Sequence, residues 1–190
     1  MTGGCRRIVL ALALPAALLP ACRSDEGVTV IPRSDLPASI YAPSPTPTPP
    51  ATIPESGLIY LAEGGRLAPA GRHLERNASS LAEALLLTLL SVAEARTAIP
   101  PDTRLLGVGV VGGVATVDLS QEFEQGGPAS TLALRVAQIV YTVTEDDSVR
   151  RVLILIEGES PPIVAGDART IIEGGRPVGR ADYTQLGPTP

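Results

Sequence analysis

The distribution of proline limits which part of this chain can build a hydrophobic core. Residues 23–56 contain eight prolines, several of them in the alternating run from Pro43 to Pro50, and few large apolar side chains. Such a segment buries too little apolar surface to offset the entropy that ordering would cost, so it stays extended or disordered. We therefore expect the fold to begin near Gly57 and the preceding segment to act as a spacer. A PxxP recognition ligand is the alternative.

The residues before this spacer have the pattern of an export signal. Arg6 and Arg7 precede fourteen apolar residues, 8–21, which end in a small residue. These features are typical of a cleaved secretory signal. The alternative, a membrane-spanning helix, requires about 20 apolar residues. The sequence therefore predicts a signal peptide over residues 1–21.

The tetrapeptide Leu19-Pro20-Ala21-Cys22 resembles a bacterial lipobox, in which the cysteine thiol receives a diacylglyceryl group before cleavage. Each buried CH₂ group contributes about 0.8 kcal/mol, and stable anchoring requires more than one acyl chain, which a diacylglyceryl group supplies. We therefore predict a lipid on Cys22, a linker over residues 22–56, and a location on the extracytoplasmic face of the bacterial cell membrane.

Removal of the signal limits what the mature protein binds and how it is held together. Loss of Arg6 and Arg7 changes the formal net charge from −5 to −7. This acidic balance argues against nucleic acid as a partner, because phosphate backbones require clustered cations. Cys5 leaves with the signal, so no intramolecular disulfide is available and the core must hold the fold.

Residues 57–183 are apolar and periodic, over a length typical of one domain, and residues 184–190 are expected to form a tail. We predict an α+β fold with two helices packed on one face of a mixed, mainly antiparallel sheet of about five or six strands. The segment 139–144 is β-branched and would also suit a strand. The expected strands are 58–62, 67–74, 104–111, 114–119, 149–156 and 163–172, and the expected helices are 81–94 and 132–143.

Two motifs that are typical of nucleotide-binding proteins do not indicate a nucleotide site in this chain. Residues 107–112 match GxGxxG, but they lie in a strand that turns at Gly112-Gly113 into another strand. A dinucleotide site requires a helix N-terminus at this point to hold the pyrophosphate. A P-loop is excluded because the chain contains no lysine.

His73 is the only histidine, so any Ser-His-Asp chemistry would depend on it. No GxSxG motif accompanies it, and the neighbouring Arg72 and Glu75 indicate an exposed strand end. A zinc site needs three or four nitrogen or sulfur ligands, which the chain lacks. We predict no catalytic residue, no cofactor and no metal site. Solvated turns and helix starts explain the acidic pairs that could suggest calcium binding or acid-base chemistry: Glu122 and Glu124, Asp146 and Asp147, and Glu157 and Glu159.

One short sequence occurs twice. Glu63-Gly64-Gly65-Arg66 is repeated as Glu173-Gly174-Gly175-Arg176. Two hairpin turns of the same chemistry explain the repeat, and a shared binding rim is the alternative.

A longer pattern identifies a family. Residues 99–108, Ile-Pro-Pro-Asp-Thr-Arg-Leu-Leu-Gly-Val, together with residues 113–123, Gly-Val-Ala-Thr-Val-Asp-Leu-Ser-Gln-Glu-Phe, closely resemble the signature of the GerMN domain, the sporulation and spore germination domain. The resemblance covers residues 57–160 and is expected to continue to Tyr183. The segment 91–99 is shorter than is usual in the family.

This resemblance implies a non-enzymatic lipoprotein that assembles envelope or sporulation machinery and has an envelope protein as its partner. The alternative is a lipoprotein that binds a small molecule or a wall fragment, with the loop 121–130 and the two repeated turns as its rim. A deep apolar pocket with convergent polar groups would favour the binder. An exposed sheet edge or apolar patch would favour the interaction module.

Overall fold

The structure is a computed structural model and describes residues 52–75, 77–92 and 96–189. The predicted signal peptide, the lipidation of Cys22 and the linker up to residue 51 lie outside the described residues. Strand β1 begins at Ser56, next to the predicted start of the domain at Gly57.

The first element is a long antiparallel hairpin. Strands β1 (Ser56–Glu63) and β2 (Arg66–His73) pair over their whole length, and Gly64 and Gly65 form the turn with φ values of 57° and 80°. This turn type requires positive φ at both central residues, which glycine adopts without strain. The first of the two repeated Glu-Gly-Gly-Arg sequences is therefore a hairpin turn, as predicted.

The two predicted helices are present. Helix α1 (Leu81–Leu90) begins at the N-cap Ser80, whose hydroxyl accepts a hydrogen bond from Glu83 N, and the Glu83 side chain accepts one from Ser79 N. Helix α2 (Ala129–Val143) starts three residues before the predicted position and includes most of the β-branched segment that could have been a strand. None of the helices in the described part of the chain has the length and apolar character that a membrane span requires.

The second sheet contains three strands in the order β3-β4-β5. Strands β3 (Leu105–Val111) and β4 (Val114–Leu119) form the predicted hairpin around Gly112 and Gly113, and β5 (Arg151–Ile156) pairs in parallel with β4. Helix α2 lies in the connection between β4 and β5, as a parallel pair requires.

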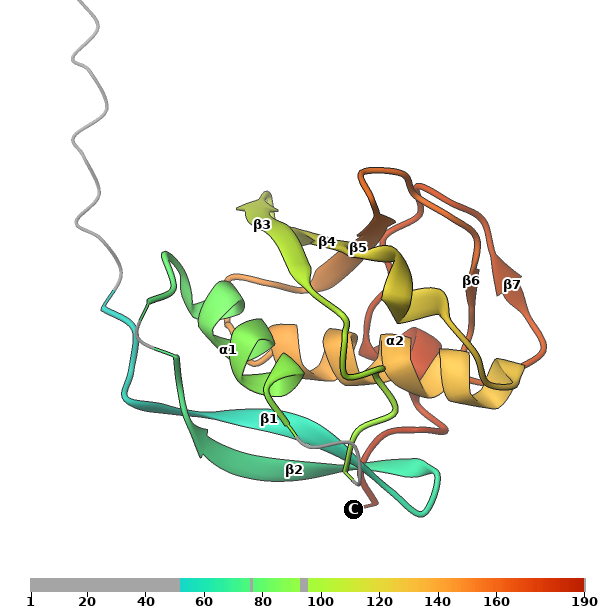
Figure 1. The fold of residues 1–190 in the computed structure, drawn as a ribbon, viewed down its shortest axis with the longest axis horizontal. Helices are drawn as coiled ribbons and strands as arrows, with labels where there is room; N and C mark the ends of the chain where they lie inside the picture. The colour runs from blue at the N-terminus through green and yellow to red at the C-terminus, as the bar shows by residue number, and fades with distance from the viewer. Residues whose placement is uncertain (1–51, 76, 93–95, 190) are drawn as a thin grey trace, which may run out of the picture. The chain divides into compact units, whose positions relative to one another are not determined.

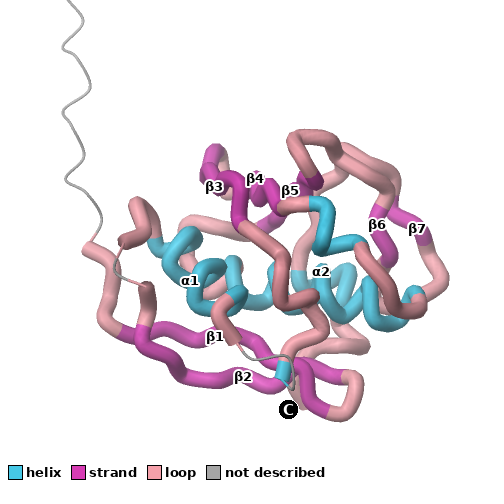
Figure 2. The backbone as a smooth tube through the Cα atoms, in the orientation of Figure 1, coloured by secondary structure: helices cyan, strands magenta, loops and turns pink. Residues whose placement is uncertain are grey.

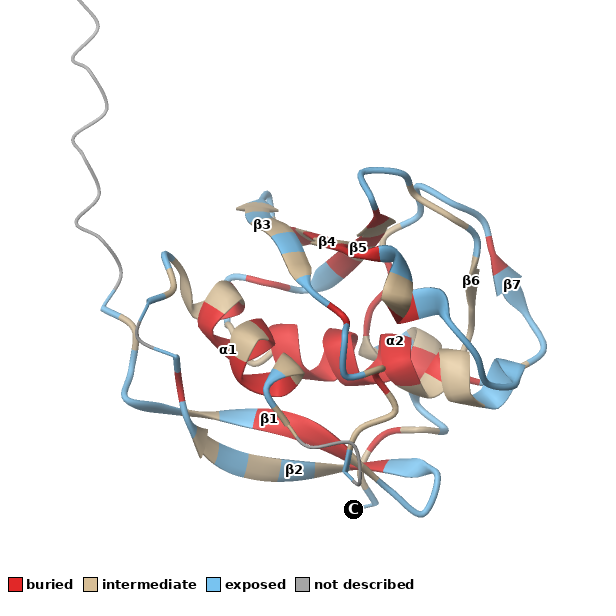
Figure 3. Cartoon of the chain, viewed as in Figure 1, coloured by how far each residue is buried: buried red, intermediate tan, exposed pale blue. Residues whose placement is uncertain are grey.

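The helices lie between the β1–β2 hairpin and the three-stranded sheet (Figure 1). Figure 3 shows the most buried residues on α1, α2 and the strands that face them. The α+β class, the two helices and the mixed, mainly antiparallel pairing are confirmed. The layout differs from the prediction, because the strands form three separate sheets and the helices are not confined to one face of a single sheet.

The burial of α2 explains this difference. A helix that is buried around most of its circumference needs packing partners on more than one side. The spacing of apolar residues in the sequence predicts a single apolar stripe on this helix, which a single sheet would cover. The buried positions of α2 also include polar residues, and together they are Ala133, Arg135, Val136, Ala137, Gln138, Ile139, Val140, Tyr141, Thr142 and Val143.

The C-terminal part contains short elements, which Figure 2 shows among loops. The predicted strand 163–172 is two antiparallel strands, β6 (Ile163–Val164) and β7 (Ile171–Ile172). It is interrupted because Asp167 Oδ1 accepts hydrogen bonds from Arg169 N and Thr170 N, which closes a turn.

Residues beyond the predicted boundary at Tyr183 also contact the domain. The 3₁₀ helix η5 spans Arg180–Tyr183. After it, Leu186 O accepts a hydrogen bond of 2.8 Å from Leu67 N in β2, and Gly187 O accepts one from Arg66 Nε. Part of the segment expected to be a tail is therefore attached to the β1–β2 hairpin.

Candidate functional site

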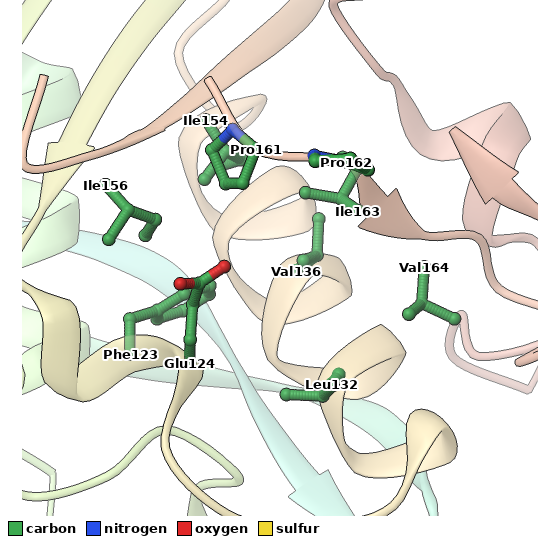
Figure 4. Close-up of a pocket in the computed structure, with 10 residues that line it drawn as sticks. All are labelled: Phe123, Glu124, Leu132, Val136, Ile154, Ile156, Pro161, Pro162, Ile163 and Val164. Carbon is green, nitrogen blue, oxygen red and sulfur yellow. The ribbon is translucent and has the colours of Figure 1, made fainter. Parts of the chain in front are cut away.

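An apolar pocket lies between the start of α2, the end of β5 and the segment that leads into β6 (Figure 4). Its floor consists of side chains that are buried in the core, and Glu124 is the only charged residue in its lining. The cavity has a volume of about 60 Å³. The lining residues are Phe123, Glu124, Leu132, Val136, Ile154, Ile156, Pro161, Pro162, Ile163 and Val164.

A short 3₁₀ helix positions the Phe123 wall of this pocket. Helix η4 spans Gln121–Glu124 and follows β4 directly. Arg135 of α2 holds it, because Arg135 Nη1 donates to Phe123 O at 2.8 Å and Nε donates to Ala98 O at 2.8 Å. Burial lowers the pKa of the Arg135 guanidinium. Arg135 thus fixes η4 relative to α2 through backbone carbonyls.

The pocket continues into a broader hollow of about 660 Å³. The two share Glu124, Ile156, Pro161 and Pro162, and the remaining lining of the hollow is Gln121, Glu157, Glu159 and Ser160. The lining contains three carboxylates and no basic side chain. Glu157 Oε1 accepts a hydrogen bond from Gln121 N. The combined groove therefore has an apolar end and an acidic rim.

The sizes of the two parts limit what this groove can bind. Pockets for small-molecule ligands usually enclose about 300–1,000 Å³. The apolar part is far smaller and accommodates a group the size of an aliphatic side chain. The acidic part favours a cationic group beside it. Within the described residues no group of three or more potential ligand side chains is placed to hold a metal ion.

A second exposed feature is the outer edge of the three-stranded sheet. Strand β3 pairs with β4 on one side, and no other strand of the described chain pairs with its second side. All seven residues of β3 are uncharged, and Leu106 and Val111 are 46% and 82% exposed. Proteins usually protect a free edge with charged residues, proline or a covering segment. The exposed residues of β3 instead leave a template for strand pairing.

Comparison with known proteins identifies the family. Residues 58–161 match the family model described as sporulation and spore germination. The chain belongs to this GerMN family. A search of the curated proteins finds no match.

Solved structures of GerMN domains are similar in fold. The tandem GerMN domains of the sporulation protein GerM from Bacillus subtilis are 19% identical with a TM-score of 0.50, and the match covers 67% of this chain and 46% of that one. The first GerMN domain of GerM alone is 24% identical with a TM-score of 0.46, covering 54% and 83%. A candidate lipoprotein from Clostridium perfringens is 18% identical with a TM-score of 0.47, covering 69% and 91%. The match to the tandem domains supports the α+β fold assignment.

The GxGxxG match of the GerMN domain lies in a β-hairpin, as predicted. Residues 107–112 occupy β3 and its turn, and the next element is β4, so no helix N-terminus is available there for a pyrophosphate. His73 is exposed at the end of β2, and His73 Nδ1 lies 3.3 Å from Glu55 O. The predicted exposed strand end is confirmed.

The repeated turns of the GerMN domain do not form a common rim. The second Glu-Gly-Gly-Arg sequence follows β7 and is a turn, in which Arg176 N donates to Glu173 O, but it does not join two paired strands. Figure 1 shows this turn and the β1–β2 turn on opposite sides of α2. Neither contributes to the lining of the groove, whereas three residues of the predicted loop 121–130 do.

A polar cluster of the GerMN domain, which the sequence did not predict, joins three elements. Tyr60 Oη donates to Glu145 Oε1 at 2.9 Å, and Arg180 is paired with the same carboxylate. The Arg180 guanidinium also lies over the rings of Tyr60 and Tyr141, at 5.4 and 5.1 Å. The pKa of Tyr60 is raised above its usual value, mainly because the side chain is buried. These groups are mutually satisfied, so the cluster joins β1, α2 and η5 and presents no free acid or base. No spacing pattern reveals it, because its members lie far apart in sequence.

Proposed function

We propose that this GerMN protein is a non-enzymatic interaction module of the bacterial cell envelope. A lipid on Cys22 anchors it at the extracytoplasmic face, the proline-rich linker carries the domain away from the membrane, and the domain assembles with an envelope protein in sporulation, germination or a related process. The family match supports the biological setting. The lipobox-like sequence supports the anchor.

The exposed edge of β3 is the observation that carries the interaction role. Seven uncharged residues with two exposed apolar side chains leave a strand that can add to another sheet. Strand addition is a common mode of protein recognition, in which the backbone provides affinity and the side chains provide specificity. Lipid anchoring would bring such a surface repeatedly to the same neighbours.

The groove favours a second function, the binding of a wall fragment. An aliphatic group would enter the apolar end, and an amine would lie against the rim at Glu124 and Glu159. The apolar end alone is too small for a typical small-molecule ligand. For this reason the interaction module is the better supported proposal.

Two experiments in the native bacterium test the proposal. Cys22→Ala should move the protein from the membrane fraction to the uncleaved or soluble fraction, and unchanged attachment of the cleaved protein would overturn the lipid anchor. The double variant Gly109→Lys and Val111→Lys should then lose the cross-links that the anchored wild-type protein forms in intact cells. Ile171→Lys is the matched control, because Ile171 is also an exposed apolar residue but lies on β7. Equal cross-linking by the β3 variant and this control would overturn the role of the edge.

The binder makes a different prediction. Glu124→Gln combined with Glu159→Gln should weaken the binding of an amine-bearing wall stem peptide and leave the cross-links unchanged. Calorimetry with the purified protein measures this binding. Binding of the peptide together with normal cross-links in the β3 variant would favour the binder over the module.

A further inference from the structure

The direction of the free backbone groups of β3 follows from its turn. Val111 and Val114 flank the two-residue turn, so their backbone groups bond to each other across the hairpin. Because the direction alternates along a strand, Gly109 and Gly107 also direct their backbone groups toward β4. The groups of Val108 and Val110 therefore point to the unpaired side and can bond to an added strand.

The side chains of β3 alternate in the same way. Val108 and Val110 pack against the core, which places Gly107, Gly109 and Val111 on the outer face of the sheet. A Cβ atom at Gly107 or Gly109 would have no atom within 4 Å, whereas Val111 is 82% exposed. The outer face thus carries one projecting side chain and two empty positions.

Nothing within the described chain requires glycine at these two positions. Neither residue has a left-handed φ, and neither position is crowded. Glycine inside a strand destabilises it by roughly 0.5–1 kcal/mol relative to alanine. A glycine of this kind often marks the close approach of another backbone or ligand. The free edge of β3 is the place where a second backbone can approach these two glycines.

We propose that β3 pairs antiparallel with β3 of a second copy of this chain, with the two Gly109 residues opposite each other. In this register Val108 and Val110 of one copy form hydrogen-bonded pairs with Val110 and Val108 of the other. On the outer face, Val111 of each copy stands opposite Gly107 of the other, where the missing side chain leaves room for it. The pattern is therefore complementary to itself.

Neighbouring registers are less favourable. A shift of two residues in one direction brings Leu106 into a hydrogen-bonded pair, but the register of the β3–β4 ladder is irregular between Leu105 and Gly107. A shift in the other direction brings the turn residue Gly112, with its φ of 60°, into the ladder. Only the register centred on Gly109 uses both outward-directed residues of both copies and avoids the irregularity and the turn.

A second copy also explains how the edge is protected. Two-fold pairing joins the two sheets in the order β5-β4-β3-β3-β4-β5, and both β3 edges are then covered. The contact is limited to one strand, so it falls below the area of about 1,200–2,000 Å² that stable complexes bury. Tethering to one membrane would raise the effective concentration. The strength of the pairing in the cell thus rests on the proposed lipid anchor, although its geometry does not.

Disulfide cross-linking of the full-length protein in native membranes tests this register. Directly opposite residues whose backbone groups do not bond to each other lie about 4.5 Å apart between Cα atoms, within the range of a disulfide. Gly109→Cys should therefore form a covalent dimer under mild oxidation. Gly107→Cys or Val111→Cys alone should not exceed the wild-type level, but cells that produce both variants together should form the mixed dimer.

The two single variants are matched controls, because their cysteines lie on the same face of the same strand. Wild type gives the background from any unprocessed chain that keeps Cys5 and a free Cys22 thiol, and equal melting temperatures show that each variant is folded. A dimer yield for Gly109→Cys no greater than for Gly107→Cys would overturn the proposal.

Failure of the pairing can be distinguished from failure of the proposed function. A photo-reactive residue at position 109 that captures a different envelope protein would overturn self-pairing and leave the interaction module standing. Loss of the anchor would appear as wild-type protein outside the membrane fraction. In that case the same cysteine variants, purified and concentrated, still report the register, and absence of the Gly109→Cys dimer there overturns the proposal.

Discussion

Gln138 is a buried polar residue whose replacement tests how the hairpin is attached to the helices. It is 0% exposed and lies on α2. Its Nε2 donates to Tyr60 O at 3.0 Å, and its Oε1 accepts a hydrogen bond from Ala98 N at 2.8 Å. One side chain thus joins α2 to β1 and to the segment that precedes β3.

Gln138→Leu keeps the approximate volume and removes both of these bonds, together with the longer one of 3.3 Å that Thr97 Oγ1 donates to Gln138 Oε1. A buried group left without a partner costs about 1–3 kcal/mol. Tyr60 O is buried, so the loss of its hydrogen bond carries the full cost. The hydrogen bond of Ala98 N is partly buried, so a water molecule can take the place of the lost acceptor in part. We therefore expect the free energy of unfolding to fall by roughly 2–4 kcal/mol.

Urea unfolding of the full-length protein in detergent measures this loss. Gln125→Leu is the control, because Gln125 is exposed, and exposed substitutions usually stay within about 0.5 kcal/mol. The midpoint should fall for Gln138→Leu with little change in the slope. Equal midpoints for the two variants would refute the argument that Gln138 carries these bonds in the folded protein.

Substitutions at three further positions and one truncation test separate parts of the structure. Ile154 is 2% exposed, so Ile154→Asp should bury an unpaired carboxylate and unfold the protein, which circular dichroism would detect. Ile154→Val should lower the free energy of unfolding by only about 0.5–1.5 kcal/mol. His73→Ala should leave melting temperature and envelope phenotype unchanged, and loss of function in a folded variant would contradict the non-enzymatic proposal. Truncation after Tyr183 should lower stability by about 1 kcal/mol or more, because Leu67 N loses its partner; an unchanged melting temperature would disprove this attachment. Hydrogen bonds from Thr170 and Arg169 lower the pKa of Asp167 to about 2. The bonded turn is therefore favoured above an unfolded pKa near 3.9 and is lost as pH falls through about 2, which an NMR titration would follow and Asp167→Asn should abolish.

The elements with a local sequence signal were predictable. The Gly112-Gly113 pair set the turn of the β3–β4 hairpin, and alternation in β4 placed Ala115, Val117 and Leu119 in the core, where all three are fully buried. The sequence of helix α1 carries a local signal of the same kind, because Ser80 is a favourable N-cap residue and the apolar residues that follow have helical spacing.

The enclosure of the helices was not predictable from such patterns. The spacing of apolar residues identifies only one buried face of α2. A second face is also buried, because polar side chains on it form hydrogen bonds with the β1–β2 hairpin. Gln138 is one of these, and Thr142 is another, since its Oγ1 accepts a hydrogen bond from Tyr60 N. A polar side chain on a helix is read as solvent-facing unless its distant partner is known.

The groove was predictable only in part, because it is assembled from three separate segments. The loop after β4 was recognised as a possible rim, and it supplies Phe123 and Glu124. The opposite wall comes from Pro161 and Pro162, which lie close in space only because parallel pairing places the end of β5 beside the end of β4. That pairing depends on the crossover through α2, so no local pattern reports it.

The two exposed features suit different kinds of partner, and this difference bears on function. The groove has an apolar end of about 60 Å³ with carboxylates beside it, a lining that fits an aliphatic group next to a cation. The β3 edge offers backbone groups and no charge, so its complementarity to an added strand depends on backbone pairing and shape. The edge and the groove are lined by different residues, so the variants at Gly109 and Val111 and those at Glu124 and Glu159 test the two surfaces separately.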